Sequence, residues 1–415
     1  MAKAGASSWG PPITCSWTRL WRTSGPWYTR SPARPTVPLA SPSPHPEWRS
    51  GPGDRKDRGT PKTPVCPEEA LAFQTTLTPR ERVRRALARE PVDRLPTQVN
   101  VTAALGQRLC NAWGIPPEAL AARLDNHLLR LELTFPSRKS PDGRVVYDWW
   151  GVGWSTETEG YWPVYSPLAE SKDLDRYPWP DPNDPHLLDE AARALASDAG
   201  EHFSLPNFGF CLFERAWALR GFERFLLDLV DDPAFAEELL ERIAEIQLVL
   251  ARRFLALGVD GGYFGDDYGG QNGPLFSPRL WRKLIQPRLA RLFAVFREAG
   301  RPVILHSDGD IAPILPDLVE IGLSALNPVQ PEVLDHVWLQ ETFGHRLAFY
   351  GGISSQSVLP QGTPDQVRAA VYACRTSLAP EGTGLILAPS HRLTSDVPVA
   401  NVEALLAAFR EGAEI

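Results

Sequence analysis

The chain has few of the features that would indicate a disulfide-stabilised, metal-thiolate, membrane or nucleic-acid-binding protein. Its 415 residues contain five cysteines and no C-x-x-C pair, so neither a disulfide framework nor a thiolate zinc site is supported. It has no run of about 18 apolar residues, which argues against a membrane span. Its formal net charge is -7, which argues against nucleic acid as a bulk partner. These absences favour a protein of the reducing cytosol.

The first 70 residues differ in composition from the rest of the chain. They hold 13 of the 41 prolines, and residues 1–66 carry 10 Lys or Arg against 3 Asp or Glu. Proline at this density prevents regular helices and central strands, so we expect residues 1–70 to be disordered. A transit peptide, an interaction tail and a wrongly assigned translation start all fit this composition. We favour a dispensable tail.

The body, taken as residues 77–412, begins with a helix signal and continues as alternating strands and helices. Thr78 is expected to cap the first helix, with Pro79 at its first position and Glu81 completing a capping box. Apolar runs, most of them separated by helical patterns, follow at 97–101, 202–212, 258–267, 302–308, 323–329, 347–353 and 384–391. Such alternation predicts an α/β fold with a parallel sheet, and seven or more strands suggest closure into a TIM (β/α)8 barrel. No G-x-G-x-x-G follows the first strand, which lowers the dinucleotide-binding alternative.

Residues 136–182 break this alternation. Within them, the segment VVYDWWGVGW carries three tryptophans and alternates like a hairpin, and a proline-rich turn follows it. We interpret 136–182 as an inserted aromatic hairpin that forms a lid over the barrel mouth, with Trp150 contacting the substrate. Simple aromatic packing of an insertion explains the same pattern equally well.

The most informative stretch of the chain is RPVILHSDGDIAPILPDLVEIGLSALNPVQPE, residues 301–332. Its first apolar run ends at His306 and Asp308, a helical pattern follows, and a second apolar run ends at Asn327 and Gln330. Polar side chains just past the carboxyl ends of successive strands are typical of the active face of an α/β barrel. We therefore expect chemistry here, with Asn327 and Gln330 contacting the substrate.

His306 and Asp308 lie two residues apart, so in an extended segment their side chains point to the same side. The pair can ligate a metal, or the carboxylate can orient the imidazole for proton transfer; helix capping by Asp308 is the alternative. His391 ends the last clear strand, and a barrel brings all strand ends to one rim. Two histidines and a carboxylate are a donor set that binds metals, so His306, Asp308 and His391 form the expected metal site.

Three further features at strand ends supply candidate site residues. Asp266 and Asp267 are adjacent acids that shift each other's pKa, and they can act as catalytic acids, metal ligands or partners of a cationic substrate group. Two ordinary loop acids are the alternative. The loop after them contains Gln271, which can contact the substrate. Gly351 and Gly352 end another strand, where glycine either lets backbone amides approach a ligand or forms a tight turn.

Residues 77–410 resemble the uroporphyrinogen decarboxylase superfamily, in particular its uncharacterised bacterial branch. The segments that carry the resemblance are RERVRRALAREPVDRLP, DWWGVGW, YPWPDP, FERAWALRGFERFLLDL, GDDYGGQNGPLFSPRLW, HSDGDIAPILPDLVEIGLSALNPVQ, YGGISSQSVLPQGTP and LILAPSHRLTSDVP. The resemblance implies a TIM barrel whose pocket lies at the carboxyl ends of the strands. This agrees with the pattern of strands and helices.

The superfamily implies two activities. One is decarboxylation of the acetate arms of uroporphyrinogen without a cofactor, and the other is methyl transfer to or from corrinoid or thiol carriers with zinc. The decarboxylases carry an arginine-rich motif after the first strand, but here that place reads TQVNVTAALGQRLC, with Arg108 alone. The decarboxylase's C-terminal histidine corresponds to His391. The methyltransferases use an H-x-C motif, in which Asp308 here replaces the cysteine, so oxygen and nitrogen ligands replace thiolates.

We therefore expect a cytoplasmic barrel enzyme that transfers a methyl group to or from a small substrate, with zinc as its metal and a corrinoid, or a corrinoid protein, as methyl carrier. One alternative is a decarboxylase of a tetrapyrrole or another carboxylate, without a cofactor. The other is a non-catalytic tetrapyrrole- or corrinoid-binding protein. Neither nucleic acid nor a membrane is expected as a partner, and a homodimer is left open.

Overall fold

The structure is a computed structural model that describes residues 76–411. The tail expected at residues 1–70 lies outside the described residues, so its disorder stays a prediction. None of the helices in the described range has the length and apolarity that a membrane crossing needs.

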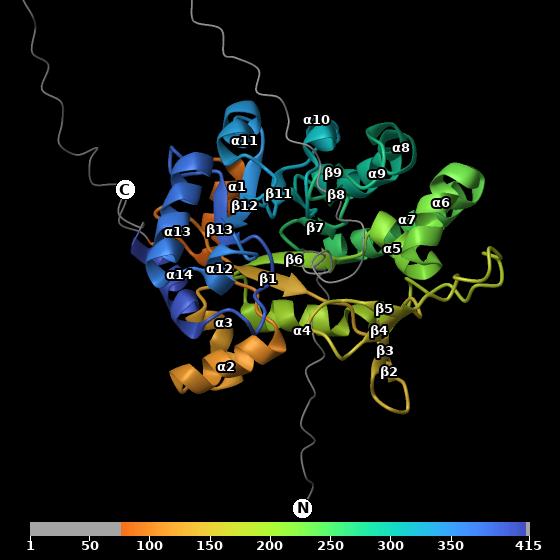
Figure 1. Ribbon diagram of the computed structural model, residues 1–415, viewed down its shortest axis with the longest axis horizontal. Helices are drawn as coiled ribbons and strands as arrows, with labels where there is room; N and C mark the ends of the chain where they lie inside the picture. Colours follow the sequence, from red (N-terminus) through yellow and green to blue (C-terminus); the bar gives the residue numbers. More distant parts are fainter. Residues whose placement is uncertain (1–75, 412–415) are drawn as a thin grey trace, which may run out of the picture. The chain divides into compact units, whose positions relative to one another are not determined.

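Seven parallel strands form a curled, TIM-like sheet, which confirms the expected α/β class (Figure 1). In sheet order they are β1 (Leu128–Leu131), β6 (Phe203–Phe208), β7 (Gly262–Gly265), β10 (Val303–His306), β11 (Ala325–Asn327), β12 (Ala348–Ile353) and β13 (Leu385–Pro389). The segment 97–101, expected as the first strand, forms isolated bridges to β13 and its continuation, at Leu387 and Leu393. The carbonyl of Thr97 also accepts a hydrogen bond from the backbone N–H of His127, just before β1. This segment therefore contacts both edges of the seven-stranded sheet.

Helices cover the outer face of the sheet, and neighbours pack in pairs such as α7 with α9 and α13 with α14 (Figure 1). The α-helices beyond the first are α2 (Ala103–Trp113), α3 (Leu120–Arg123), α4 (Asp189–Asp198), α5 (Phe213–Arg220), α6 (Phe222–Asp231), α7 (Pro233–Ala256), α8 (Pro278–Leu284), α9 (Gln286–Arg297), α10 (Leu315–Glu320), α11 (His336–Phe343), α12 (Val358–Gln361), α13 (Pro364–Leu378) and α14 (Val399–Glu411). Short 3-10 turns are η3 (Pro117–Ala119), η4 (Pro185–Leu188) and η5 (Ala312–Ile314). The chain between β10 and β11 starts two short helices, η5 and α10, because Pro313 and Pro316 each lack the N–H that a continuous helix would use.

The first helix, α1 (Pro79–Ala88), begins as the sequence predicts. The Thr78 hydroxyl accepts a hydrogen bond from the Glu81 backbone N–H at 3.1 Å. A capping box would also require the Glu81 carboxylate to accept a hydrogen bond from the Thr78 backbone N–H. That carboxylate pairs with Arg84 instead. The cap is therefore present, while the Glu81 side chain stabilises the exposed face of the helix.

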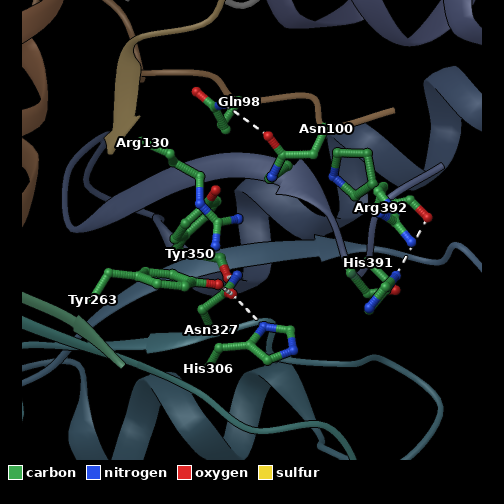
Figure 2. A pocket seen from close by; sticks show the side chains of 12 residues that line it. Gln98, Asn100, Arg130, Tyr263, His306, Asn327, Tyr350, His391 and Arg392 are labelled. Atoms are coloured by element: carbon green, nitrogen blue, oxygen red, sulfur yellow. Dashed lines mark hydrogen bonds between the residues drawn. The ribbon is translucent and has the colours of Figure 1, made fainter. Parts of the chain in front are cut away.

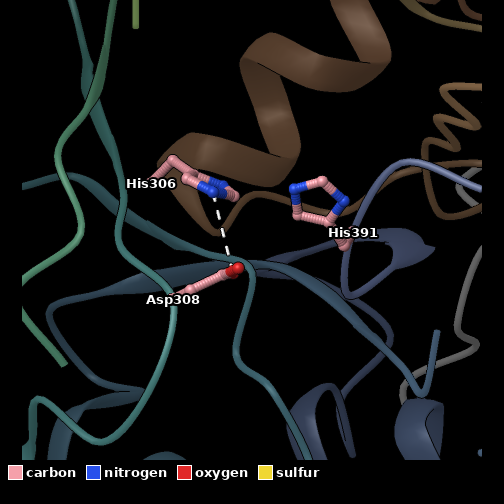
Figure 3. A group of neighbouring side chains, drawn as sticks. All are labelled: His306, Asp308 and His391. Atoms are coloured by element: carbon pink, nitrogen blue, oxygen red, sulfur yellow. Dashed lines mark ion pairs between the residues drawn. The ribbon is translucent and has the colours of Figure 1, made fainter. Parts of the chain in front are cut away.

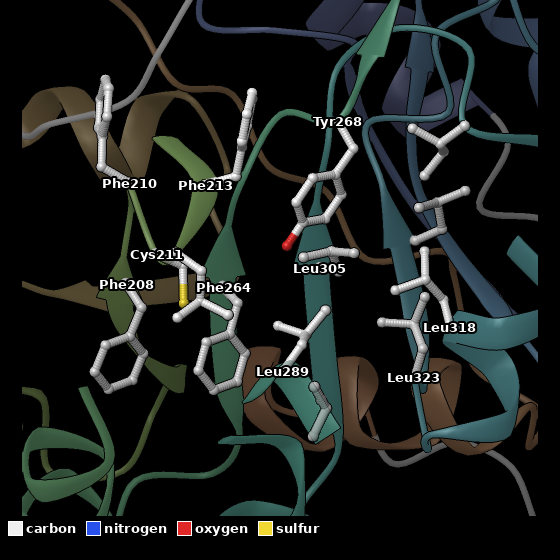
Figure 4. Close-up of a cluster of buried hydrophobic side chains, with 14 of the residues drawn as sticks. Phe208, Phe210, Cys211, Phe213, Phe264, Tyr268, Leu289, Leu305, Leu318 and Leu323 are labelled. Carbon is white, nitrogen blue, oxygen red and sulfur yellow. The ribbon is translucent and has the colours of Figure 1, made fainter. Parts of the chain in front are cut away.

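Helix α1 also fills the amino-terminal end of the space that the sheet encloses, through Val83 and Leu87. The enclosed core consists of Val83, Leu87, Leu128, Phe203, Leu205, Tyr263, Ile304, Ala325, Ala348, Tyr350, Ile386 and Ala388. A larger core lies between the sheet and the helices, and Figure 4 shows part of it, including Leu305. Since successive side chains of a strand face opposite sides, Ile304 points inward and Leu305 outward. His306 therefore faces the enclosed side again.

The insertion between β1 and α4 contains the expected hairpin within an antiparallel sheet. Its strands are β2 (Arg138–Lys139), β3 (Val145–Tyr147), β4 (Gly153–Ser155) and β5 (Pro163–Tyr165). A two-stranded ribbon, β8 (Gly269–Gly270) with β9 (Gly273–Pro274), follows β7. Trp149 and Trp150 of the insertion line a cavity together with Gly209 at the end of β6. The insertion thus lies against the carboxyl ends of the strands, and its role as a lid stays a prediction.

Candidate functional site

His306 ends β10 and Asn327 ends β11, and the register of the two strands pairs them. His306 Nδ1 lies 2.6 Å from Asn327 Oδ1. The Asn327 amide is oriented by two more bonds, because its Nδ2 donates to the Tyr350 carbonyl and its Oδ1 accepts from the Tyr263 hydroxyl. Oδ1 is therefore an acceptor, so Nδ1 of His306 carries the proton and Nε2 presents a lone pair.

The lone pair of His306 Nε2 is buried and has no protein hydrogen-bond partner among residues 76–411. Instead it lies 3.7 Å from Asp308 Oδ1 (Figure 3). It also lies 3.8 Å from Asp267 Oδ1. Burial lowers the pKa of His306 to about 4, and the positive charge of Arg130 acts in the same direction. At neutral pH the imidazole is thus uncharged, and its lone pair faces two acids.

The two acids beside His306 are themselves buried, with Asp267 1% and Asp308 4% exposed. Asp267 Oδ1 accepts a hydrogen bond from the Asp308 backbone N–H at 2.8 Å, while Oδ2 of each residue lacks a partner in the described range. Burial raises the pKa of Asp267 to about 7, and burial together with the charge of Asp267 raises the pKa of Asp308 well above its usual range. Such a pair needs either a cation or retained protons.

His391 approaches the same point from the loop after β13. Its ring centroid lies 5.9 Å from that of His306, and the two rings are inclined by 65°. One ligand atom each from His306, Asp308 and His391 lies within 4.8 Å of the other two (Figure 3). A divalent cation there would satisfy Nε2 of His306 and the free oxygen of Asp308. The residues therefore fit a metal with two nitrogen donors and one oxygen donor, such as zinc.

Asp266 occupies a different environment from its neighbour Asp267. Its carboxylate accepts hydrogen bonds from the backbone N–H groups of Leu212, Phe213 and Glu214, and from the Tyr268 hydroxyl. These four donors occupy both oxygens and fix the start of α5. Burial raises the pKa of Asp266 to about 6, although these hydrogen bonds oppose the increase.

Gly351 and Gly352 lie within β12 rather than after it, and both have positive φ angles, 133° and 101°. A Cβ at Gly351 would overlap the carbonyl of Pro328, and one at Gly352 would overlap the Cys374 sulfur. Close packing therefore requires glycine at both positions. Neither glycine lines the cavity beside His306.

The other expected substrate contacts lie at three different places. Gln330 is buried, and its Oε1 accepts a hydrogen bond from the Gly309 backbone N–H at 3.2 Å, next to Asp308. Gln271 is exposed in the turn between β8 and β9. Trp150 lines a second cavity. The structure thus places Gln330 against the loop that follows His306, and it places Gln271 and Trp150 outside the cavity beside His306.

A cavity opens beside His306 at the carboxyl ends of the strands (Figure 2). Its lining residues are Gln98, Asn100, Arg130, Tyr263, His306, Asn327, Tyr350, Ala388, Pro389, Ser390, His391 and Arg392. The lining contains two arginines and no carboxylate. Arg130, Tyr263 and Tyr350 are site residues that the sequence patterns did not predict. The available signal for Arg130 was its position two residues before Glu132 in an apolar run, which places both charges on one face of a strand.

The second cavity lies under the insertion and is more aromatic. Its lining residues are Glu132, Leu133, Phe135, Asp148, Trp149, Trp150, Asn207, Phe208, Gly209, Arg215, Gln247, Leu250 and Phe254. Asp148 and Arg215 form a buried ion pair with an N–O distance of 2.6 Å. Asn207 joins the linings of the two cavities, because its Oδ1 accepts from Arg130 and its Nδ2 donates to Glu132.

The family model and a curated relative point to one family, and a solved structure shows a similar fold. The model of the family described as Uroporphyrinogen decarboxylase (URO-D) matches residues 144–412. Uroporphyrinogen decarboxylase of Methylococcus capsulatus is 23% identical over 356 residues, which cover 79% of this chain and 96% of that protein. A methyltransferase from Methanosarcina mazei has a similar fold, with a TM-score of 0.63, 21% identity, and coverage of 80% of this chain and 98% of that one. The matched range contains His306, Asp308 and His391, whereas Arg130 precedes it.

Proposed function

The chain belongs to the uroporphyrinogen decarboxylase family, and from that membership we propose that it is a metal-dependent enzyme that transfers a methyl group to or from a small substrate. The observation that carries the proposal is the lone pair of His306 Nε2. It is buried without a protein partner in the described range, and it faces Asp308 with His391 beside it. A neutral imidazole and a carboxylate held in this way are the arrangement of a metal site before the metal binds.

His306, His391 and Asp308 would hold the metal, with zinc as the expected ion. When bound, zinc would supply Lewis-acid chemistry at a coordination position that the three side chains leave open. Asn327 orients the His306 ring so that Nε2 faces the site. The Asp267 carboxylate accepts a hydrogen bond from the Asp308 backbone N–H and thereby positions Asp308. The proposed methyl carrier is a corrinoid, presented by a second protein.

Residues 97–101 lie between the two edges of the seven-stranded sheet. We infer that they act as the eighth strand of a closed TIM (β/α)8 barrel, because they bridge β13 and also bond to the residue before β1. In such a barrel all strand ends meet at one rim. This explains how His306 and His391, 85 positions apart in the sequence, come to face one cavity.

Metal analysis of the purified protein, combined with an activity assay, tests the proposal. We expect stoichiometric divalent metal and metal-dependent demethylation of methylcobalamin in the presence of a thiol, followed by the change in its absorption. Folded protein that neither contains nor binds a divalent metal would contradict the proposal.

Decarboxylation without a cofactor is the second candidate function. It is favoured by the two arginines that line the cavity, Arg130 and Arg392, because decarboxylase substrates are carboxylates. Release of carbon dioxide from uroporphyrinogen, with no dependence on metal, would favour this function over methyl transfer.

A further inference from the structure

Arg130 brings a positive charge into the cavity beside His306, and no carboxylate among residues 76–411 forms a hydrogen bond or a close ion pair with it. Its Nη2 donates a hydrogen bond of 2.6 Å to an amide oxygen, that of Asn207, and its guanidinium lies 4.4 Å from the centroid of the Tyr263 ring. Its Nε is buried and has no hydrogen-bond partner among residues 76–411. A buried guanidinium with an unused donor is costly unless a ligand completes its hydrogen bonds.

Glu132, two residues further along the chain, does not neutralise Arg130 by direct contact. The amide of Asn207 stands between them, and its Nδ2 donates to Glu132 Oε1 at 2.8 Å. Burial raises the pKa of Glu132, which favours its neutral form. The Arg130 charge opposes this increase, but the two side chains are bridged by Asn207 and do not contact each other. The guanidinium therefore remains available to an anionic group in the cavity.

The charges around His306 are divided between two sides. Arg130 and Arg392 belong to the lining of the cavity (Figure 2), while Asp267 and Asp308 face Nε2 and are not part of that lining. An anionic group fits the arginine side, and a cation fits the acid side. A substrate that spans both would present its anion to Arg130 and its reacting atom to His306.

We propose that Arg130 binds a carboxylate group of the substrate and thereby anchors it in the cavity beside His306. A planar guanidinium matches a planar carboxylate and can donate two parallel hydrogen bonds to it. This inference rests on the proposed function only in placing the reacting atom of the substrate beside His306. In this proposal the carboxylate positions the substrate and is not itself the reacting group.

Calorimetric titration with simple carboxylates and their neutral isosteres tests the proposal. Acetate and benzoate are expected to bind the purified full-length protein, and acetamide and benzamide to bind at least about tenfold more weakly, because they lose the charge-assisted hydrogen bonds. Arg130→Met should weaken benzoate binding by at least about tenfold, and Arg130→Lys should weaken it less, since lysine keeps the charge. Arg123→Met is the matched control, because Arg123 also stacks on a ring, that of Trp113, but is exposed.

Three results would overturn the carboxylate site. The first is equal benzoate affinity in the wild type and in both Arg130 variants. The second is benzamide binding as tight as benzoate binding. The third is that the wild type binds no carboxylate. Tighter binding of inorganic phosphate than of either carboxylate would also overturn it and assign a phosphate ligand. Circular dichroism of each variant verifies its fold, and the lysine variant keeps the test open if the methionine variant does not fold.

Repeating the titration after metal removal separates this proposal from the proposed function. Binding of benzoate that needs metal but not Arg130 would place the anion on the metal, so the methyltransferase proposal would stand and the carboxylate site would fail. If benzoate binding depends on Arg130 in a protein that never takes up metal, the carboxylate site would stand and the methyltransferase proposal would fail. Arg130-dependent binding that survives chelation of a metal-containing protein supports both.

Discussion

Asn327 determines which nitrogen of His306 faces the candidate metal site. The two side chains meet through a contact of 2.6 Å between His306 Nδ1 and Asn327 Oδ1. Since Asn327 also bonds to Tyr263 and Tyr350, its amide cannot flip without losing two further hydrogen bonds. The tautomer of a histidine on one strand is thus set by the neighbouring strand.

Replacing Asn327 by alanine should lower metal affinity about 10- to 100-fold, as loss of a hydrogen bond to a ligating histidine typically does. The His306 ring would then be free to adopt either tautomer. Competition with a chromophoric chelator measures the affinity. Asn327→Asp is the control, since its carboxylate still accepts the Nδ1 proton and should preserve most of the affinity. Equal affinity of wild type and Asn327→Ala would refute a positioning role for Asn327.

Asp308→Asn should remove most of the bound metal while leaving the fold intact. An amide keeps the size of the side chain but loses the charge that a divalent cation requires. The neighbouring Asp310 supplies a matched control, because its Oδ1 caps the Ala312 backbone N–H at 3.0 Å and asparagine caps about as well. Elemental analysis of Asp308→Asn and Asp310→Asn should therefore differ. The same metal content in both variants would exclude Asp308 as a ligand.

Asp266→Asn should destabilise the protein by roughly 2–4 kcal/mol, because one amide oxygen cannot satisfy the four donors that the carboxylate accepts from. Asp267→Asn should have little effect on stability, or increase it slightly, since the new amide would keep an acceptor for the Asp308 backbone without a buried charge. Urea unfolding of both variants measures the difference. A larger loss of stability in the Asp267 variant would contradict this assignment.

His127 should make the protein less stable as the pH falls below about 6.5, the ordinary pKa of histidine. Its Nδ1 accepts from the Thr97 backbone N–H, and its Nε2 lies 3.1 Å from nitrogens of Arg82 and Arg94. Burial, and then the charge of Arg94, lowers the pKa of His127 to about 3. Between these two pKa values, His127 is therefore protonated in the unfolded chain and neutral in the folded chain. The stabilisation is complete above about pH 6.5 and is lost as the pH falls towards 3, by about 1.4 kcal/mol per pH unit.

Urea unfolding at pH 7, 6 and 5 compares the wild type with His127→Gln. The variant is expected to be less stable than the wild type at pH 7. On acidification it should lose less stability than the wild type, by about 1.4 kcal/mol per pH unit, because it lacks one proton-binding group. Other titrating groups are present in both proteins, so they cancel in the comparison. Curves that run parallel from pH 7 to 5 would show that His127 is not the group responsible.

The sequence predicted the strand-end residues of this site because the signal for them is local. His306 and Asp308 follow an apolar run directly, and so does Asn327. By contrast, β1 is four residues long and passes directly into the insertion, so the alternation that marks a strand is too short to separate it. Arg130 was missed for this reason. An arginine on the inner face of a sheet also runs against the usual preference for apolar residues there.

The adjacent acids show what a pattern of residue types leaves undetermined. The sequence assigns Asp266 and Asp267 the same candidate roles, but neighbouring residues of an extended chain face opposite sides. One carboxylate therefore reaches the start of α5 and the other reaches Asp308. The packing of Gly351 against Pro328 depends on two separate segments, so no local pattern could have predicted it.

Helix α1 has a kinetic consequence through the residues with which it fills the enclosed core. Val83 is fully buried and Leu87 is 5% exposed, so the amino-terminal end of the enclosed space is sealed by side chains. In the proposed methyl transfer, the substrate, the methyl carrier and the product would then all pass through the cavity at the carboxyl ends of the strands. A molecule bound there would block the next one, so the reaction would follow a fixed order of binding and release.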